Sequence, residues 1–225
     1  MYWLFNSSIG RKFIMSISGI FLILFLLFHM SMNLTLLFSD ETYDMICEFL
    51  GANWYAIVGT LVLAAGMAVH FIYASILTLQ NRSARGSDKY LSSNKTKTEW
   101  AAKNMYVLGL IIVLGIIIHL WNFWYRMQFA EIIHSPDAVI EGSGLVKGLF
   151  SDPCYVVVYL VWLGALWFHL THGVWSAFQT IGFNNNTWFS RLKLISNVVA
   201  TLIVMGFAVI PVYFCFCYFI NCLKI

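Results

Sequence analysis

The chain has 225 residues, of which 60% are hydrophobic and only 10% are charged, with a net charge of +3 at pH 7. A soluble globular domain carries about 25% charged residues, so this composition excludes a soluble enzyme and indicates a protein embedded in a membrane. The five cysteines lack the C-x-x-C spacing of zinc and iron–sulfur sites. The sequence also shows no glycine-rich phosphate loop and no basic-aromatic surface for nucleic acid.

Five apolar runs are each long enough to cross a bilayer, which needs about 20 residues. They cover residues 13–38, 54–80, 104–125, 155–182 and 194–219. The first run is too long for the core of a signal peptide, and Pro211 is expected to kink the fifth. The sequence therefore predicts an all-α integral membrane protein, with residues 1–225 forming a single transmembrane domain of five helices.

The basic residues predict how these spans are oriented. If the N-terminus is inside, the inner segments hold ten of them: Arg11, Lys12, Arg82, Arg85, Lys89, Lys95, Lys97, Lys103, Arg191 and Lys193. The outer segments then hold three: Arg126, Lys147 and Lys224. An excess of basic residues marks the cytoplasmic side, which predicts N-in, C-out. The basic segment 81–103 is either a solvated loop or a docking surface for a soluble partner. The outer segment 127–152 is long enough for a short helix on the membrane surface.

Four of the spans carry a histidine at mid-membrane, where an ionisable residue by default indicates function. His29 and His119 lie 17 and 16 residues past Lys12 and Lys103, about 25 Å from the inner boundary. His70 lies 12 residues before Arg82 and His169 lies 13 residues before Gly182, about 18–20 Å from the same boundary. Spans one and three therefore pair at one depth, and spans two and four at another.

Two histidine pairs within a four-helix bundle are the arrangement that holds two stacked haems by their axial ligands. A macrocycle must pass close to the helix backbone, which favours small residues one turn from the ligand. Gly66, Gly115 and Gly173 lie four residues from His70, His119 and His169, whereas His29 has no such glycine. Each ligating imidazole is expected to be neutral, with its other ring nitrogen donating to a carbonyl or hydroxyl. The alternative is that these histidines pack by hydrogen bonding or form a proton path.

Two stretches carry a resemblance to a known family. SSIGRKFIMSISGIFLILFLLFHMSMNL at the N-terminus and HLTHGVWSAFQTIG in the fourth span resemble the di-haem cytochrome b anchor of succinate:quinone oxidoreductases. The similarity is to the single-chain, five-helix type of succinate dehydrogenase and quinol:fumarate reductase, in its Bacteroidetes-like branch. It covers essentially the whole chain, although the fifth span has no specific motif.

The resemblance implies a four-helix haem-binding bundle with a fifth, peripheral helix in a bacterial inner membrane. Two haems b would be ligated by His29 with His119 and by His70 with His169. His172 is a less favoured alternative to His169, because only His169 has a glycine four residues on.

The family also implies an electron-transfer subunit of the respiratory chain that does not act on succinate or fumarate by itself. Its partners would be a flavoprotein with FAD and an iron–sulfur subunit on the cytoplasmic face, and its substrate a membrane quinone, commonly menaquinone. The family allows a dimer of the whole complex.

A quinone head group needs hydrogen-bond donors and a proton donor or acceptor near a haem. The candidates near the outer pair are Asn33, Asn122 and Arg126, with Glu41, Asp44 and Glu48 for protons. The competing interpretation is that these are interfacial polar residues and a solvated acidic loop.

Two further functions stay open at this point. The chain could be the haem b subunit of another respiratory enzyme, or a haem-free structural or transport protein whose histidines link helices. No Asp, Glu, Lys or Arg lies inside any of the five runs, and a carrier that moves ions by charge relay normally needs one there. The sequence therefore favours electron transfer.

Overall fold

The computed structural model describes residues 7–85, 100–183 and 185–223. The described chain is helical: α2 (Ser8–Leu34), η1 (Thr35–Leu37), α3 (Asp40–Phe49), α4 (Trp54–Arg85), α5 (Trp100–His119), η2 (Leu120–Phe129), α6 (Ala130–Ile132), α7 (Gly142–Phe150), α8 (Pro153–Thr180) and α9 (Asn186–Leu223). Lys89, Lys95, Lys97 and Lys224 from the orientation argument lie outside the described residues. The inside and outside assignment stays a prediction.

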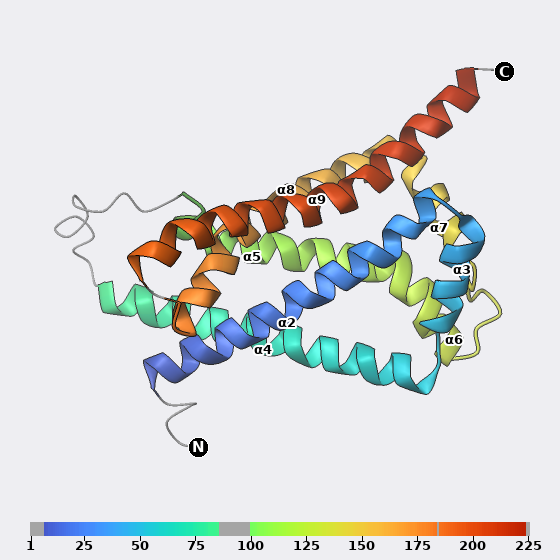
Figure 1. Ribbon diagram of the computed structural model, residues 1–225. Coiled ribbons are helices and arrows are strands. Elements are labelled where there is room, and N and C mark those ends of the chain that lie inside the picture. The colour runs from blue at the N-terminus through green and yellow to red at the C-terminus, as the bar shows by residue number, and fades with distance from the viewer. Residues whose placement is uncertain (1–6, 86–99, 184, 224–225) are drawn as a thin grey trace.

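Five long helical segments lie along one another and are long and apolar enough to cross a membrane (Figure 1). They are Ser8–Leu37, Trp54–Ala84, Trp100–Ile132, Pro153–Thr180 and Thr187–Leu223. This confirms the prediction of an all-α, multi-pass membrane protein. The short helices α3 and α7 lie together at one end of the bundle (Figure 1), which we call the α3–α7 end.

The helices are longer than the apolar runs that predicted them. Helix α2 begins five residues before its run, at Ser8, and the Ser7 hydroxyl caps it by accepting a hydrogen bond from the backbone N–H of Gly10 (2.9 Å). Helix α4 continues to Arg85, and α9 begins at Asn186 and continues without a break through Pro211. Long basic side chains can keep their charges in the head-group region, so a helix need not end where its apolar run ends.

The third span changes its winding directly after His119. Residues Leu120–Phe129 form a π-helix, η2, which is wider than an α-helix and is typical of functional sites. Near its end, Gln128 is only 7% exposed. Its side-chain oxygen accepts from Thr60 Oγ1 and Trp124 Nε1, both at 2.8 Å, and its amide donates to the carbonyl of Gly51 at 2.9 Å. Gln128 therefore fastens the end of the third span to the start of the second.

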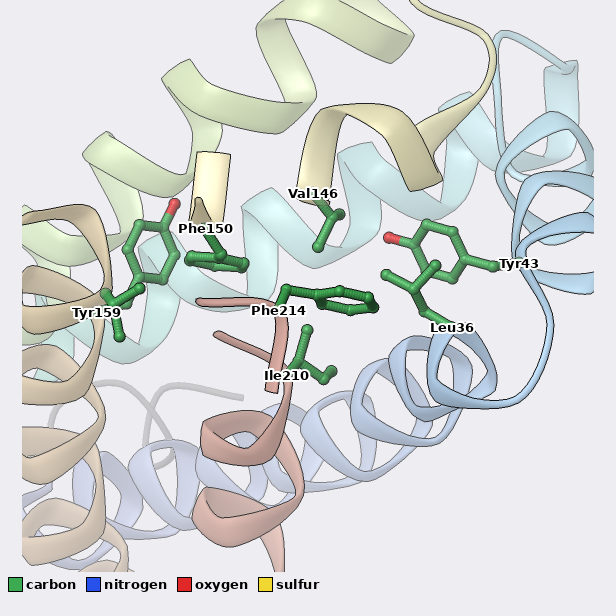
Figure 2. Packing of buried hydrophobic residues seen from close by; sticks show 8 residues of the cluster. Leu36, Tyr43, Val146, Phe150, Tyr159, Ile210 and Phe214 are labelled. Atoms are coloured by element: carbon green, nitrogen blue, oxygen red, sulfur yellow. The ribbon is translucent and has the colours of Figure 1, made fainter. Parts of the chain in front are cut away.

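The acidic segment after the first span is a helix rather than a solvated loop. Ser39 caps α3 by accepting from the backbone N–H of Thr42 (3.1 Å), and Asp40 lies in the first turn, where a carboxylate is favourable. The segment 127–152, which is long enough to hold a short helix, contains α7. Figure 2 shows how Tyr43 of α3 and Val146 of α7 meet Phe214 of α9 in one apolar cluster.

Helices α8 and α9 form the most closely packed pair. In the most apolar window of each, 33% of residues are buried, against 6% in the second and third spans. Ala200 and Ile203 of α9 are 0% exposed, in a cluster with Leu166 and Leu170 of α8. The buried Ser196 hydroxyl lies 3.0 and 2.7 Å from the carbonyl oxygens of Leu170 and Thr171, to which it donates. Helix α9 thus contributes to the core, and it packs on α2 and α7 as well as on α8.

Candidate functional site

The four predicted histidines come from four helices and meet in two pairs. His29 of α2 and His119 at the end of α5 have ring centroids 5.8 Å apart with the rings nearly perpendicular (85°). His70 of α4 and His169 of α8 have centroids 6.3 Å apart at 65°. These are the two pairs expected from depth along the spans. Their role as metal ligands stays a prediction.

Both separations fit two imidazoles on opposite sides of one metal. An imidazole nitrogen binds a transition metal at about 2.0 Å and lies about 1.1 Å from its ring centre, so two rings opposite each other on one metal have centroids about 6 Å apart. The helices hold the rings at this spacing through their own packing, and ligation of one metal by each pair stays a prediction.

Aromatic side chains enclose the pair nearer the α3–α7 end. Phe25 stacks on His29 with centroids 5.4 Å apart, and Phe207 of α9 covers another side at 5.6 Å. His119 contacts the rings of Phe123 and Trp162, at 5.1 and 5.8 Å. This apolar shell excludes water and keeps the imidazoles neutral, as ligation requires.

The other pair has smaller neighbours, which the sequence reasoning missed. Ser18 Oγ donates to the carbonyl of Met15 (3.0 Å) and lies 3.2 Å from Nδ1 of His70. Because the hydroxyl already donates to Met15, Ser18 is placed to accept from Nδ1–H of His70, and in that tautomer Nε2 keeps the free lone pair. A hydroxyl partner of this kind is what a ligating histidine was expected to have. No sequence motif signals Ser18, because it lies on another helix.

Two glycines approach the same pair. A Cβ atom added to Gly19 would lie 3.3 Å from Cε1 of His70, and one added to Gly109 would lie 3.9 Å from Cε1 of His169. Small residues therefore face both rings of this pair. The only signal for them in the sequence is that each interrupts a run of large apolar residues.

The three predicted glycines differ from one another. The Phe21 ring lies against Gly66, where an added Cβ would be 2.5 Å from its Cε1 atom, and the Trp162 indole lies against Gly115. Gly173 has nothing within 4 Å of an added Cβ. In this structure only Gly173 faces open space, and the absence of a side chain at Gly66 and Gly115 makes room for aromatic rings.

Buried ring nitrogens test whether the pairs fit a metal. Nδ1 of His119 and Nδ1 of His169 are buried without a hydrogen-bond partner. A neutral imidazole has one donor and one acceptor nitrogen, and leaving one unsatisfied in an apolar interior costs about 1–3 kcal/mol. Each pair therefore contains one imidazole with such a nitrogen, although this feature is not confined to the two pairs and does not by itself identify a metal ligand.

The number of histidines in each pair fits iron in a macrocycle better than a bare ion. Across residues 7–85, 100–183 and 185–223, no group of three or more His, Cys, Asp or Glu side chains could hold a metal ion. A bare metal ion commonly takes at least three protein ligands, whereas haem iron takes its remaining axial ligands from the protein. Two histidines per pair equal the number of axial ligands that a haem iron can take from a protein, and haem itself stays a prediction.

His172, the alternative ligand, faces a different neighbour. Its ring contacts Trp175 with centroids 4.8 Å apart in a T-shaped arrangement. The ring that contacts His70 is that of His169. The structure therefore favours His169 over His172 as the partner of His70, and the choice stays a prediction.

Three of the six predicted quinone-binding side chains already have protein partners. Asn33 donates to the carbonyl of His29 (2.8 Å), and Asn122, only 7% exposed, donates to Tyr159 Oη (3.2 Å). Asp44 accepts from the backbone N–H and the hydroxyl of Ser143, at 2.7 and 2.6 Å. The contacts of Asn122 and Asp44 join helices, which favours a structural role for these two residues. The Asn33 contact lies within α2, and the Asn33 amide is also 3.4 Å from both ring nitrogens of His29.

The remaining quinone candidates, Arg126, Glu41 and Glu48, have exposed side chains. Glu41 and Glu48 line an open cleft of about 410 Å³ between α3 and the segment before α7, together with Asp44 and Glu141. The structure therefore brings together the two histidine pairs, and it gathers Glu41, Asp44 and Glu48 at one cleft. Their role towards a quinone stays a prediction.

No family model, curated protein or solved structure matches this chain.

Proposed function

We propose that this protein is a cytochrome b membrane anchor that carries electrons through two haems b. His29 and His119 would ligate one haem, and His70 and His169 the other. The observation that carries the proposal is the geometry of the pairs, in which four histidines from four spans lie at 5.8 and 6.3 Å between ring centroids. Haem, when bound, supplies reversible one-electron chemistry.

Side chains of the protein prepare both histidine pairs for ligation. Ser18 accepts from Nδ1–H of His70 and so orients this ring and selects its tautomer. Phe25 and Phe207 hold the His29 ring and exclude water from it. A low-dielectric environment disfavours charged imidazole, so both pairs stay neutral and able to bind iron at ordinary pH.

The resemblance of the first and fourth spans extends the proposal to a respiratory complex. The anchor would pass electrons between an iron–sulfur subunit and a membrane quinone, and a flavoprotein subunit would act on succinate or fumarate. Charge supports one docking surface, since Arg11, Arg82, Lys103 and Arg191 all lie near helix ends opposite the α3–α7 end (Figure 1). The polar side of an anchor that binds soluble subunits is expected to be charged in this way.

The test is a reduced-minus-oxidised spectrum of the protein purified in mild detergent from its native membrane, with haem quantified per chain. The proposal expects b-type bands and two haems per chain. A folded, colourless protein would reject the electron-transfer function. The co-purifying subunits test the second part: a flavoprotein supports succinate or fumarate chemistry, and a molybdenum or nickel subunit would assign the chain to another respiratory enzyme.

A further inference from the structure

Trp162 of α8 reaches from the helix of one histidine pair to the other pair. It precedes His169 by seven residues, which is about two helical turns, so both side chains leave α8 on nearly the same face, about 10 Å apart along the helix. The Trp162 indole contacts the ring of His119, with centroids 5.8 Å apart. Helix α8 therefore contributes a predicted ligand to one pair and an aromatic neighbour to the other.

The facing helix α5 shows at which level this indole lies. A Cβ atom added to Gly109 would lie 3.9 Å from Cε1 of His169, and one added to Gly115 would overlap the indole of Trp162. Gly115 is six residues past Gly109 and four before His119, which is about 9 Å and about 6 Å along the helix. The indole therefore lies between the level of His169 and the level of His119.

Two contacts with α5 fix the indole in this position. Its Nε1 donates to the carbonyl oxygen of Ile112 (3.1 Å), and the missing side chain at Gly115 lets the ring lie against the helix backbone. Tyr159, which is 5% exposed, meets the indole nearly at right angles, with centroids 5.6 Å apart. A ring held by a hydrogen bond and by close packing on two sides has little freedom to move.

His119 lacks the kind of hydrogen bond that orients His70. Nδ1 of His119 is buried without a partner, whereas Nδ1 of His70 lies 3.2 Å from the Ser18 hydroxyl. A ligating histidine is normally oriented by a partner at its second ring nitrogen. The side chains that contact the His119 ring from its own span and from α8 are aromatic: Phe123, Tyr159 and Trp162.

We propose that Trp162 is a positioning residue of the His29–His119 pair, whose fixed indole holds the plane of the His119 ring and keeps water out of the layer between the two pairs. This inference rests on the proposed function, because it concerns the haem that the pair would hold. Without the indole, His119 can rotate and water can approach the iron. Water stabilises the more highly charged oxidised iron, which lowers the reduction potential of the haem.

The test compares Trp162→Leu with Trp162→Phe and Trp167→Leu in the complex purified from its native membrane. Phenylalanine keeps an aromatic ring beside His119. Trp167→Leu is the matched control, because Nε1 of Trp167 donates to Thr201 of α9 (3.0 Å) instead of to α5. A redox titration at the b-type bands gives the potential of each haem. The EPR spectrum of the oxidised protein reports the angle between the two histidine ring planes of each haem.

The proposal expects one haem to change and the other to stay as it is. In Trp162→Leu the potential of the His29–His119 haem should fall and its EPR signal should shift, with a smaller change in Trp162→Phe and none in Trp167→Leu. The signal that remains in His169→Ala identifies this haem. Loss of this haem alone in Trp162→Leu also supports the proposal. Two unchanged signals in Trp162→Leu, or equal changes in Trp167→Leu, would overturn it.

Gly115→Ala covers the case in which Trp162→Leu does not accumulate or loses both haems. The added methyl group displaces the indole, so this variant should shift the signal of the same haem. In a Trp162→Phe background it should add little, because the smaller ring leaves room for the methyl group. Unchanged signals in Gly115→Ala contradict the inference alone. A native protein without haem would reject the proposed function, and this inference with it.

Discussion

The contact between α8 and α9 and the two histidine pairs are built in opposite ways. Between α8 and α9 the buried groups satisfy each other: Ile203 is 0% exposed, and the Ser196 hydroxyl has two carbonyl acceptors. Around the pairs, Nδ1 of His119 and of His169 are buried without a partner. Buried polar groups in proteins are normally bonded, so the α8–α9 contact is complete by itself, whereas one imidazole of each pair has bonding capacity that the protein does not fill.

This comparison also assigns different tasks to the two sides of the bundle. Helices α8 and α9 supply a rigid support, since protein interiors tolerate few changes of volume. Helix α4, where few residues are buried, contributes His70 to the His70–His169 pair, whose bonding capacity the protein alone does not fill. Substitutions in the two regions should therefore have different effects. Those in the α8–α9 contact should change stability, and those at the histidine pairs should change haem content.

The largest effect is expected from removing a histidine of a pair. His169→Ala should reduce the haem content from two per chain to one, because a haem with one axial histidine lost is not retained in that place. His172→Ala, three residues along the same helix, is the matched control and should keep both. Pyridine haemochrome quantification of the purified variants measures this. Loss of haem in His172→Ala alone would mean that His172 is the ligand.

The next largest effect is expected in the α8–α9 contact. Ile203→Ala removes a side chain that is 0% exposed and should lower the free energy of unfolding by about 2–5 kcal/mol, as large-to-small substitutions in cores do. Leu202→Ala removes a similar side chain that is 62% exposed and should change stability far less. Thermal unfolding in detergent compares the two. Equal shifts would show that the contact is not the rigid part of the bundle.

Gly173 offers a sharper test of whether a haem occupies the space beside the His70–His169 pair. An added Cβ at Gly173 meets nothing within 4 Å, so Gly173→Ala should leave thermal stability of the haem-free protein unchanged. A macrocycle held by His169 would approach this helix face, so the same variant should lose haem from the His70–His169 pair. Gly164→Ala, on the same helix and equally open, serves as control. Full haem content in Gly173→Ala would remove Gly173 from the site.

The smallest effect is expected from the hydroxyl of Ser196. Ser196→Ala removes one hydrogen bond between α9 and α8, and such bonds in membrane proteins contribute about 0.6 kcal/mol on average. Ser31→Ala removes an exposed hydroxyl that donates to its own helix at Leu27 and should have a smaller effect still. Urea or detergent unfolding resolves the difference. A larger effect for Ser31 would contradict the assignment of Ser196 as a link between helices.

The length and charge of the apolar runs sufficed to predict five membrane helices, because both are local properties of the sequence. The rise per helical residue also allowed the histidines to be paired by depth, and the structure brings His29 beside His119 and His70 beside His169. The helix ends were less accurate: the start of α9 was placed eight residues late, at 194 instead of 186.

Only the tertiary structure decided which residues surround the pairs. Nearly every face of these helices is apolar, so the sequence does not indicate how each helix is rotated towards its neighbours. Ser18 beside His70, Trp162 against Gly115 and the partner of Asn122 all depend on that rotation. Depth along a helix follows from counting residues, whereas contacts across helices follow from packing, and packing depends on all the helices at once.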